Sequence, residues 1–230
     1  MMKNIYKLIL IAFLYLSSSH VISAQHIGFV GGYTMTGLEQ SNYGVNGDFS
    51  LLNGYHVGPK VDLDVVPNSN KFTLTLATLF EMRANRYDIS WYKPYTTQTR
   101  ILYYLYLPLD LTYRKKMAED VNWLFFGGPR LSIGLFGLTN EHYYMATKPQ
   151  LKDTSPFYGE PSMRAKDFSF GIGTGIELEN FQFMLGYDLP LTNSVVNIDP
   201  SPSVLKQHNF RFSIAYTLSL IHISEPTRPY

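Results

Sequence analysis

The stretch FSFGIGTGIELENFQFMLGYDLPL, residues 168–191, decides the fold of this chain. Every second residue in it is apolar except Thr174, first from Phe168 to Leu178 and then from Phe181 to Leu191. The residues between them are small or polar, and Glu179-Asn180 separates the two runs as a two-residue turn. Because successive side chains of a strand point to opposite faces, the stretch predicts a hairpin with one apolar and one polar face.

The same alternation recurs along residues 25–217. It predicts eight strands, near residues 26–36, 54–66, 71–83, 101–114, 121–136, 166–178, 181–192 and 207–217. Long and short connections follow one another in turn, which is typical of outer-membrane barrels with short periplasmic turns and longer external loops. Four prolines remove ladder donors and predict bulges or strand ends: Pro59, Pro108, Pro129 and Pro190. We therefore expect an all-β protein, an eight-stranded up-and-down antiparallel transmembrane β-barrel with both ends in the periplasm.

Both ends of the chain are expected to lie outside the barrel domain, which we place at residues 25–217. Residues 1–24 are expected to be a signal peptide, with Lys3 and Lys7 before a short apolar core and a small-residue cleavage site. Residues 218–230 are expected to be an artefact, because 218–228 match the in-frame translation of a transposase-based sequencing adapter. A genuine proline-containing tail is the alternative.

The composition narrows the class of protein. The chain has 19 Lys+Arg and 18 Asp+Glu, and without the two end segments 16 and 17 remain. This balance gives no indication of nucleic-acid binding. The absence of cysteine leaves neither a lipid anchor on Cys nor a disulfide framework. A mean hydropathy near zero suits a barrel, in which only alternate residues meet lipid.

The ionisable residues of the predicted strands share the face opposite the apolar residues. A charge that faced lipid at the midplane would cost about 2–4 kcal/mol, so these side chains are expected to point inward and pair with one another. The interior of an eight-stranded barrel is just filled by its own side chains. We predict a lumen plugged by paired charges, formed by Lys60, Asp62, Asp64, Glu81, Arg83, Asp110, Arg114, Arg130, Glu177, Asp188 and Arg211.

Aromatic residues gather near the strand ends, where two girdles anchor a barrel at the level of the lipid head groups. The girdle predicted beside the short turns consists of Phe72, Tyr113, Trp123 and Phe181. The girdle predicted toward the long loops consists of Tyr33, Tyr55, Phe80, Tyr103, Phe168 and Tyr187.

The sequence predicts neither a catalytic nor a metal site. Gly171, Gly173 and Gly175 alternate on one strand face, unlike a dinucleotide-binding fingerprint, and are expected to relieve crowding inside a narrow barrel or allow it to bend. The histidines of the domain are expected at strand ends or in loops, without a nucleophile motif or metal-ligand spacing: His26, His56, His142 and His208. We expect no enzymatic activity and no cofactor.

The longest connection, 137–165, is rich in aromatic residues and proline. As an exposed loop it would bind a partner protein or a glycan, and the alternative is a loop that folds over the barrel mouth. The residues expected to contact a partner are Tyr143, Tyr144, Phe157 and Tyr158.

Four strand motifs are informative about the family. LYLPLDLTYR, residues 105–114, is similar to the Y-L-x-I-P-L-x-L-K-Y strand of the PorT-like outer-membrane β-barrel family of Bacteroidota. GGPRLSIG, residues 127–134, resembles the family's following G-P-x-x-x-x-G strand. Residues 167–193 resemble its Gly-rich penultimate hairpin, and 210–216 resemble its closing strand. The resemblance implies an architecture without catalytic residues, and one founding member of the family is linked to protein secretion and gliding.

These observations predict a signal-peptide-exported monomer in the outer membrane of a Gram-negative cell, surrounded by outer-membrane lipid and inserted by the barrel-insertion machinery. Its expected role is that of a non-enzymatic scaffold or interaction partner, associated with secretion as in the PorT-like family. One alternative is a barrel whose lumen binds or translocates a small solute or lipid. Another is a soluble periplasmic lipocalin-like binding protein, with its apolar residues inside and its charges outside.

Overall fold

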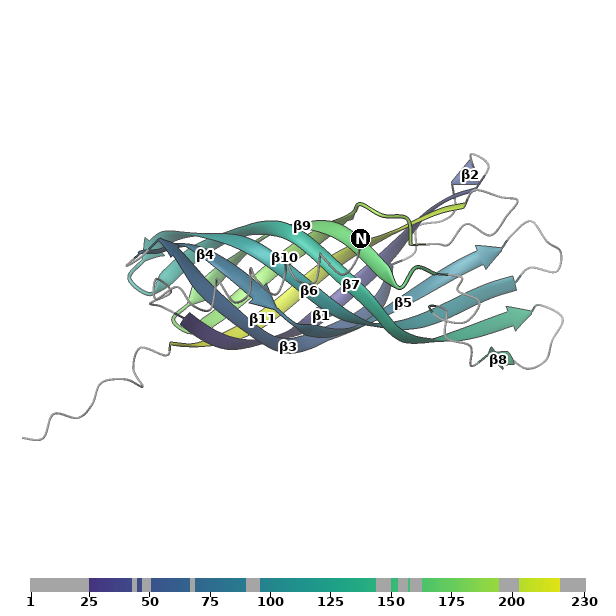
Figure 1. Ribbon diagram of the computed structural model, residues 1–230, viewed down its shortest axis with the longest axis horizontal. Coiled ribbons are helices and arrows are strands. Elements are labelled where there is room, and N and C mark those ends of the chain that lie inside the picture. Colours follow the sequence, from purple (N-terminus) through teal and green to yellow (C-terminus); the bar gives the residue numbers. More distant parts are fainter. Residues whose placement is uncertain are drawn as a thin grey trace, which may run out of the picture.

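The described chain forms one antiparallel sheet that closes into a barrel (Figure 1). The computed structural model describes residues 25–42, 45–46, 51–66, 69–89, 96–143, 150–152, 157, 163–194 and 203–219. β1 (Gln25–Asn42) pairs with β3 (Leu51–Val66) on one side and with β11 (Ser203–Ser219) on the other, which closes the ring. The wall between β3 and β11 continues through β6 (Thr96–Ala118), β7 (Val121–Tyr143), β9 (Lys166–Leu178) and β10 (Phe181–Pro190).

One position in the wall is shared by two segments, β4 (Ser69–Ala77) and β5 (Leu79–Ile89), since both pair with β3 and β6. With these two counted as one, the ring has eight antiparallel strands, which confirms the predicted fold class. The prediction of one continuous strand over 71–83 is wrong, because the ladder breaks at Thr78. The Thr78 N–H donates to the carbonyl oxygen of Pro59 at 3.0 Å, so Pro59 still serves as an acceptor although it has no donor.

Side chains alternate between the two faces of the wall as the sequence pattern predicts. In β9, Phe168, Phe170 and Ile172 are each more than 40% exposed, whereas Asp167 and Ser169 are buried. Apolar side chains therefore cover the outside, and charged ones line the lumen. This arrangement contradicts the lipocalin-like alternative, which requires the opposite distribution.

The two ends of the barrel differ. At one end, here called the turn end, β6 joins β7 and β9 joins β10 through two-residue turns, and Glu179 has a φ of 52°. At the other, the loop end, the β6–β7 ladder continues as far as the pair Thr96↔Tyr143. β5, β6 and β7 project beyond the rest of the wall there, and so do β1 and β11 (Figure 1). Beyond the ring, β2 (Val45–Asn46) pairs with β1 and β8 (Gln150–Lys152) with β7.

The expected end segments fall largely outside this description. The signal peptide, residues 1–24, lies outside the described residues, and so do residues 220–230. β11 continues through Leu218 and Ser219, which pair with Ile27 and His26, so the last strand runs two residues into the segment attributed to the adapter. No helix in the described part of the chain is long and apolar enough to cross a membrane.

Candidate functional site: the charged lumen

The side chains predicted to plug the lumen do lie inside the barrel. Ten of the eleven are at most 9% exposed: Lys60, Asp62, Glu81, Arg83, Asp110, Arg114, Arg130, Glu177, Asp188 and Arg211. Asp64 is the exception, since it lies half-buried near the turn end of β3. The structure therefore brings together charges from strands that are far apart in the sequence.

Nearest the loop end, Arg83 and Glu81 form a fully buried pair. Arg83 Nη2 donates to Glu81 Oε2 at 2.7 Å and to Ser132 Oγ at 2.8 Å. The Arg83 guanidinium also lies 4.4 Å from the ring centroid of Tyr104, a cation–π distance. Gln207 accepts a further hydrogen bond from Arg83 at 3.3 Å. The charge of Arg83 is thus balanced by Glu81 inside the barrel.

In the middle of the lumen, Arg211 joins two acidic residues. It donates to Glu81 Oε1 at 2.8 Å and to Asp188, and its guanidinium lies 4.0 Å from the Tyr106 ring centroid. Arg130 lies 2.5 Å from Asp110 and 3.6 Å from Asp188. Asp188 therefore links the two arginines, and because all these groups are buried, removal of one would leave an unbalanced charge in a medium of low dielectric constant.

Toward the turn end, a second network crosses the lumen. Lys60 Nζ donates to Asp62 at 2.9 Å and to the side-chain oxygen of Gln182 at 2.6 Å. Arg114 lies 3.0 Å from Glu177 and 3.7 Å from Asp62. Gln182 also donates to Glu177 at 2.6 Å. These contacts connect β3, β6, β9 and β10 across the interior.

The predicted lumen set omitted several residues, among them His56 and Asp167. His56, expected at a strand end or in a loop, lies within β3 at 1% exposure, and that prediction is wrong. His56 lies four residues before Lys60, so strand alternation places both side chains on the lumen face. This spacing could have identified His56 as a lumen residue. Its ring nitrogens lie 2.9 Å from Thr34 Oγ1 and 2.8 Å from Ser213 Oγ. Asp167 is 5% exposed and accepts hydrogen bonds from Thr192 and Ser194.

Glycines on the lumen face receive the largest side chains. A Cβ on Gly171 would overlap the guanidinium of Arg130, and one on Gly173 would overlap the ring of Phe126. Gly134 receives the ring of Phe157 in the same way. These glycines provide the space that a narrow barrel needs for its bulky lumen residues.

At the loop end, an apolar cap covers the Arg83 layer. It consists of Leu102, Tyr104, Phe157 and Met163, all at most 3% exposed. The rings of Phe157 and Tyr104 meet edge to face at 5.3 Å between centroids. The Gly134 N–H donates to the Ala165 carbonyl at 2.7 Å and fixes the segment that carries Met163.

The cap includes one of the four residues that were expected to contact a partner. Phe157 belongs to the interior of the barrel, in line with the alternative that the loop folds over the mouth. Tyr143 ends β7, while Tyr144 and Tyr158 lie outside the described residues.

The packing of the described lumen residues leaves spaces, of which two are informative. One, of about 80 Å³, lies among Leu79, Tyr106, Met184 and Arg211, which gives it both apolar and charged walls. The other, a polar recess of about 260 Å³, lies at the turn end beside Asp64. Arg114 and Gln182 line both spaces. No cluster of three metal-ligating side chains occurs within the described ranges.

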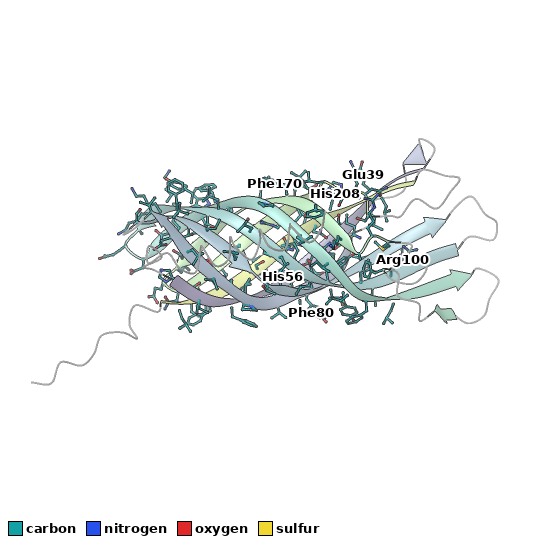
Figure 2. The ribbon with its side chains drawn as sticks, in the orientation of Figure 1. Glu39, His56, Phe80, Arg100, Phe170 and His208 are labelled. Carbon is teal, nitrogen blue, oxygen red and sulfur yellow. The ribbon has the colours of Figure 1, made fainter. Side chains whose placement is uncertain are left out.

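The predicted girdle aromatics lie on the outside of the wall, in two groups (Figure 2 shows Phe80 and Phe170 there). Near the turn end, Phe72 contacts Tyr113 and Phe181 contacts Tyr216, each with ring centroids 5.0 Å apart, and Trp123 stacks on Phe125 at 5.1 Å. Toward the loop end, the contacts are Phe80–Tyr103, Tyr103–Phe136, Tyr187–Phe210 and the cross-strand neighbours Tyr33 and Tyr55. Phe168 is 48% exposed on the same outer face.

Comparison with known proteins places this architecture among outer-membrane barrels. The family model of the outer membrane protein beta-barrel domain matches residues 18–196. No curated protein sequence matches the chain.

The solved structures that are similar at low sequence identity include the following three outer-membrane proteins. Ail of Yersinia pestis has a TM-score of 0.40 and 11% identity, over 84% of this chain and 98% of Ail. A major outer membrane protein from Thermus thermophilus has a TM-score of 0.38 and 15% identity, over 85% and 100%. Neisserial surface protein A has a TM-score of 0.37 and 10% identity, over 83% and 97%.

Proposed function

Because the chain belongs to the outer membrane protein beta-barrel domain family, we propose that it is a non-enzymatic scaffold or interaction protein that works through its loop end while its lumen stays closed. The protein is an outer-membrane β-barrel, and its turn end faces the periplasm in the orientation typical of such barrels.

The filled lumen is the observation that supports this role. From the loop end to the turn end, the interior holds an apolar cap, the Arg83–Glu81 pair, the Arg211–Asp188–Arg130 group and the Lys60–Arg114 network. The space of about 80 Å³ between these layers has room for a few water molecules and is smaller than an ordinary ligand pocket. Exchange with other molecules is therefore left to the outer surfaces.

The finer assignment is to a PorT-like, secretion-associated member from Bacteroidota, exported by its signal peptide. It is supported by the strand motifs at 105–114 and 127–134, which form neighbouring parts of β6 and β7 in the barrel. The projecting ladders of β5, β6 and β7 are the surface on which a protein or glycan partner would be met, beside the 137–165 loop. The protein is proposed to act as a monomer, because its eight-stranded ring closes within one chain.

A conductance measurement tests the closed lumen. The full chain in a planar lipid bilayer should give no stable conductance steps. An Arg83→Ala/Arg211→Ala/Phe157→Ala variant should conduct, because it loses side chains from three successive layers. Steady steps from the unaltered protein would contradict the proposal.

A site-specific crosslinking experiment tests the scaffold role in the native cell. A photoreactive residue at Thr97, in the projecting part of β6, should crosslink one defined partner. The same residue at Lys116, at the turn end of the same strand, is the control and should not give that product. Identical products at both positions, or none at Thr97, would contradict the role.

A second function, small-solute or lipid binding in the lumen, is favoured by the two spaces that meet at Arg114 and Gln182. It would require the Lys60–Arg114 network to open toward the turn end. Conductance or solute uptake by the unaltered protein would support this function over the first.

A further inference from the structure

The outward faces of β1, β10 and β11 change from apolar to charged and polar side chains near the loop end. From Leu218 to Phe210, every outward residue of β11 is apolar or aromatic, and Phe29, Tyr33 and Met35 continue that surface on β1. Beyond Phe210, the outward residues are His208 and Lys206 on β11 and Glu39 on β1. Among the described outward side chains of these three strands, they are the only acidic, basic or imidazole groups.

These residues form one connected group with Tyr187 of β10, here called the rim cluster: Glu39, Tyr187, Lys206 and His208. His208 Nε2 lies 3.0 Å from Glu39 Oε2, and His208 Nδ1 lies 2.6 Å from the Tyr187 hydroxyl (Glu39 and His208 are labelled in Figure 2). Because a carboxylate only accepts hydrogen bonds, Nε2 carries the proton and donates to Glu39. A neutral ring then accepts from Tyr187 at Nδ1.

The fourth member of the rim cluster completes a pair of opposite charges. Lys206 is the cross-strand partner of Glu39, so the basic and the acidic side chain start from neighbouring backbone positions. Glu39 remains 59% exposed although His208 holds one of its oxygens, whereas His208 is only 17% exposed. His208 and Tyr187 therefore fix the position of a carboxylate that stays accessible from outside.

The rim cluster lies at the boundary of the apolar band. On β1, Ile27 is an outward residue near the turn end, and Gly37, the cross-strand partner of His208, follows it ten positions later. With a rise of about 3.3 Å per residue and a strand tilt of about 40°, the level of His208 lies about 25 Å above that of Ile27 along the membrane normal. That distance equals the height of the apolar band of an outer-membrane barrel, about 25 Å. The lipid head groups on the loop-end side of the band are at this level.

We propose that the rim cluster binds the zwitterionic head group of a membrane amphiphile, with the ammonium group at Glu39 and the phosphate at Lys206. The rings of Tyr187 and His208, stacked at 6.0 Å between centroids, form the aromatic floor beside the ammonium group. The acyl chains extend along Phe210 and Met35 toward the middle of the band. This site is independent of the lumen and of the proposed scaffold role.

Other possible ligands differ from a zwitterionic amphiphile in the charge of the head group or in the presence of an acyl chain. An anionic head group without an ammonium group would meet Lys206 but would be repelled by Glu39. A soluble zwitterion would find both charges but would lack the contact with Phe210 and Met35. The site therefore favours an amphiphile that carries both charges and an acyl chain.

Native mass spectrometry of the full chain in detergent tests this, with phosphatidylethanolamine, phosphatidylglycerol and diacylglycerol as probes. One phosphatidylethanolamine should be retained per protein. Its ratio of lipid-bound to lipid-free protein should be about tenfold higher than that of phosphatidylglycerol or diacylglycerol. Glu39→Gln and Lys206→Gln should each abolish this preference. Tyr187→Phe should weaken it, because His208 loses its hydrogen bond with the Tyr187 hydroxyl.

Matched controls come from the turn end, where Lys115 and Glu119 are also exposed charges. Lys115→Gln and Glu119→Gln should leave the preference unchanged, and the unboiled gel mobility of every variant checks that it is folded. Equal retention of the three lipids, or an unchanged preference in both rim variants, would overturn the proposal. Equal competition by soluble phosphoethanolamine would overturn the membrane source of the ligand.

Discussion

Glu81 is fully buried and is shared by two arginines and Thr34, which makes it the residue on which the upper lumen network depends. Glu81→Ala would leave Arg83 and Arg211 without their common counter-charge. Breaking a buried pair in this way costs about 3–5 kcal/mol, so the free energy of unfolding should fall by that amount. Urea unfolding in phospholipid vesicles, followed by tryptophan fluorescence, measures it.

The comparison for this experiment is Glu119→Ala, which removes an exposed carboxylate at the turn end and should have little effect on stability. Arg130→Ala should resemble Glu81→Ala, since it leaves Asp110 unpaired. Unfolding curves of Glu81→Ala and Arg130→Ala that coincide with that of the unaltered protein would exclude the network as a source of stability.

Gly171 provides a second test, of packing rather than charge. Gly171→Ala should displace the Arg130 guanidinium and destabilise the barrel by about 1–3 kcal/mol, the usual cost of overpacking. Gly186→Ala on the same lumen face is the matched control, because its new methyl group would lie 3.6 Å from the nearest atom, an ordinary contact. The temperature at which the unboiled gel band disappears should fall for the first variant only.

For individual residues, the sequence predicted which charged side chains point inward, but it did not predict which side chains they pair with. Lys60, Asp62 and Arg130 follow directly from strand phase, because a charge that faces lipid is costly. His56 has the same phase but was assigned to a strand end, since the predicted strand began only two residues earlier. Pairings such as Arg83 with Gln207 depend on which strands face each other across the lumen, which local periodicity does not encode.

Among the elements, β6 contributes Leu102 and Tyr104 to the apolar cap, and Phe157 and the segment that carries Met163 complete it. Phe157→Ala should remove the ring that fills the slot at Gly134 and cost about 3–5 kcal/mol. It should also expose the segment, so that trypsin cleaves after Arg164 faster than in the unaltered protein. Phe170→Ala, which removes an outward ring, is the control and should leave this cleavage rate unchanged. An equal rate in all three proteins would show that Phe157 does not hold the segment.

The strands themselves were predicted in number and order, but several of their ends were not. Residues 96–100 and 139–143 are polar on both faces, so the period of two disappears although the β6–β7 ladder continues. The break at Thr78 also escaped prediction. It depends on Pro59 of the neighbouring strand and on Gly58, where a Cβ would overlap the Thr78 carbonyl oxygen.

For the whole molecule, closure of the ring by β1 and β11 predicts resistance to detergent. The mature protein, refolded without the residues of the expected adapter segment that lie outside β11, should migrate faster on a gel when it is not boiled. The reason is that a closed hydrogen-bonded ring has no free edge from which to unravel. Identical mobility with and without boiling, together with solubility in plain buffer, would contradict a membrane barrel.

The placement of the wall in lipid can be tested on the same protein. The chain contains no cysteine, so a single Phe183→Cys or Ser213→Cys variant takes one label. A label at the outward position 183 should be quenched by a lipid-phase reagent, and one at the buried lumen position 213 should be protected. Equal quenching at both positions would mean that the inside and outside of the wall are misassigned.

The length of the β6–β7 ladder sets how far the wall rises above the bilayer at the loop end. A strand of 23 residues spans about 75 Å and, at a tilt of about 40°, reaches about 57 Å along the membrane normal. The apolar band takes about 25 Å of this, and the rest is divided between the two ends of the strand. The seven residues beyond the loop-end girdle residue Tyr103 rise about 18 Å above the band. A force applied at the tip of this ladder would pass through paired strands directly into the wall of the barrel.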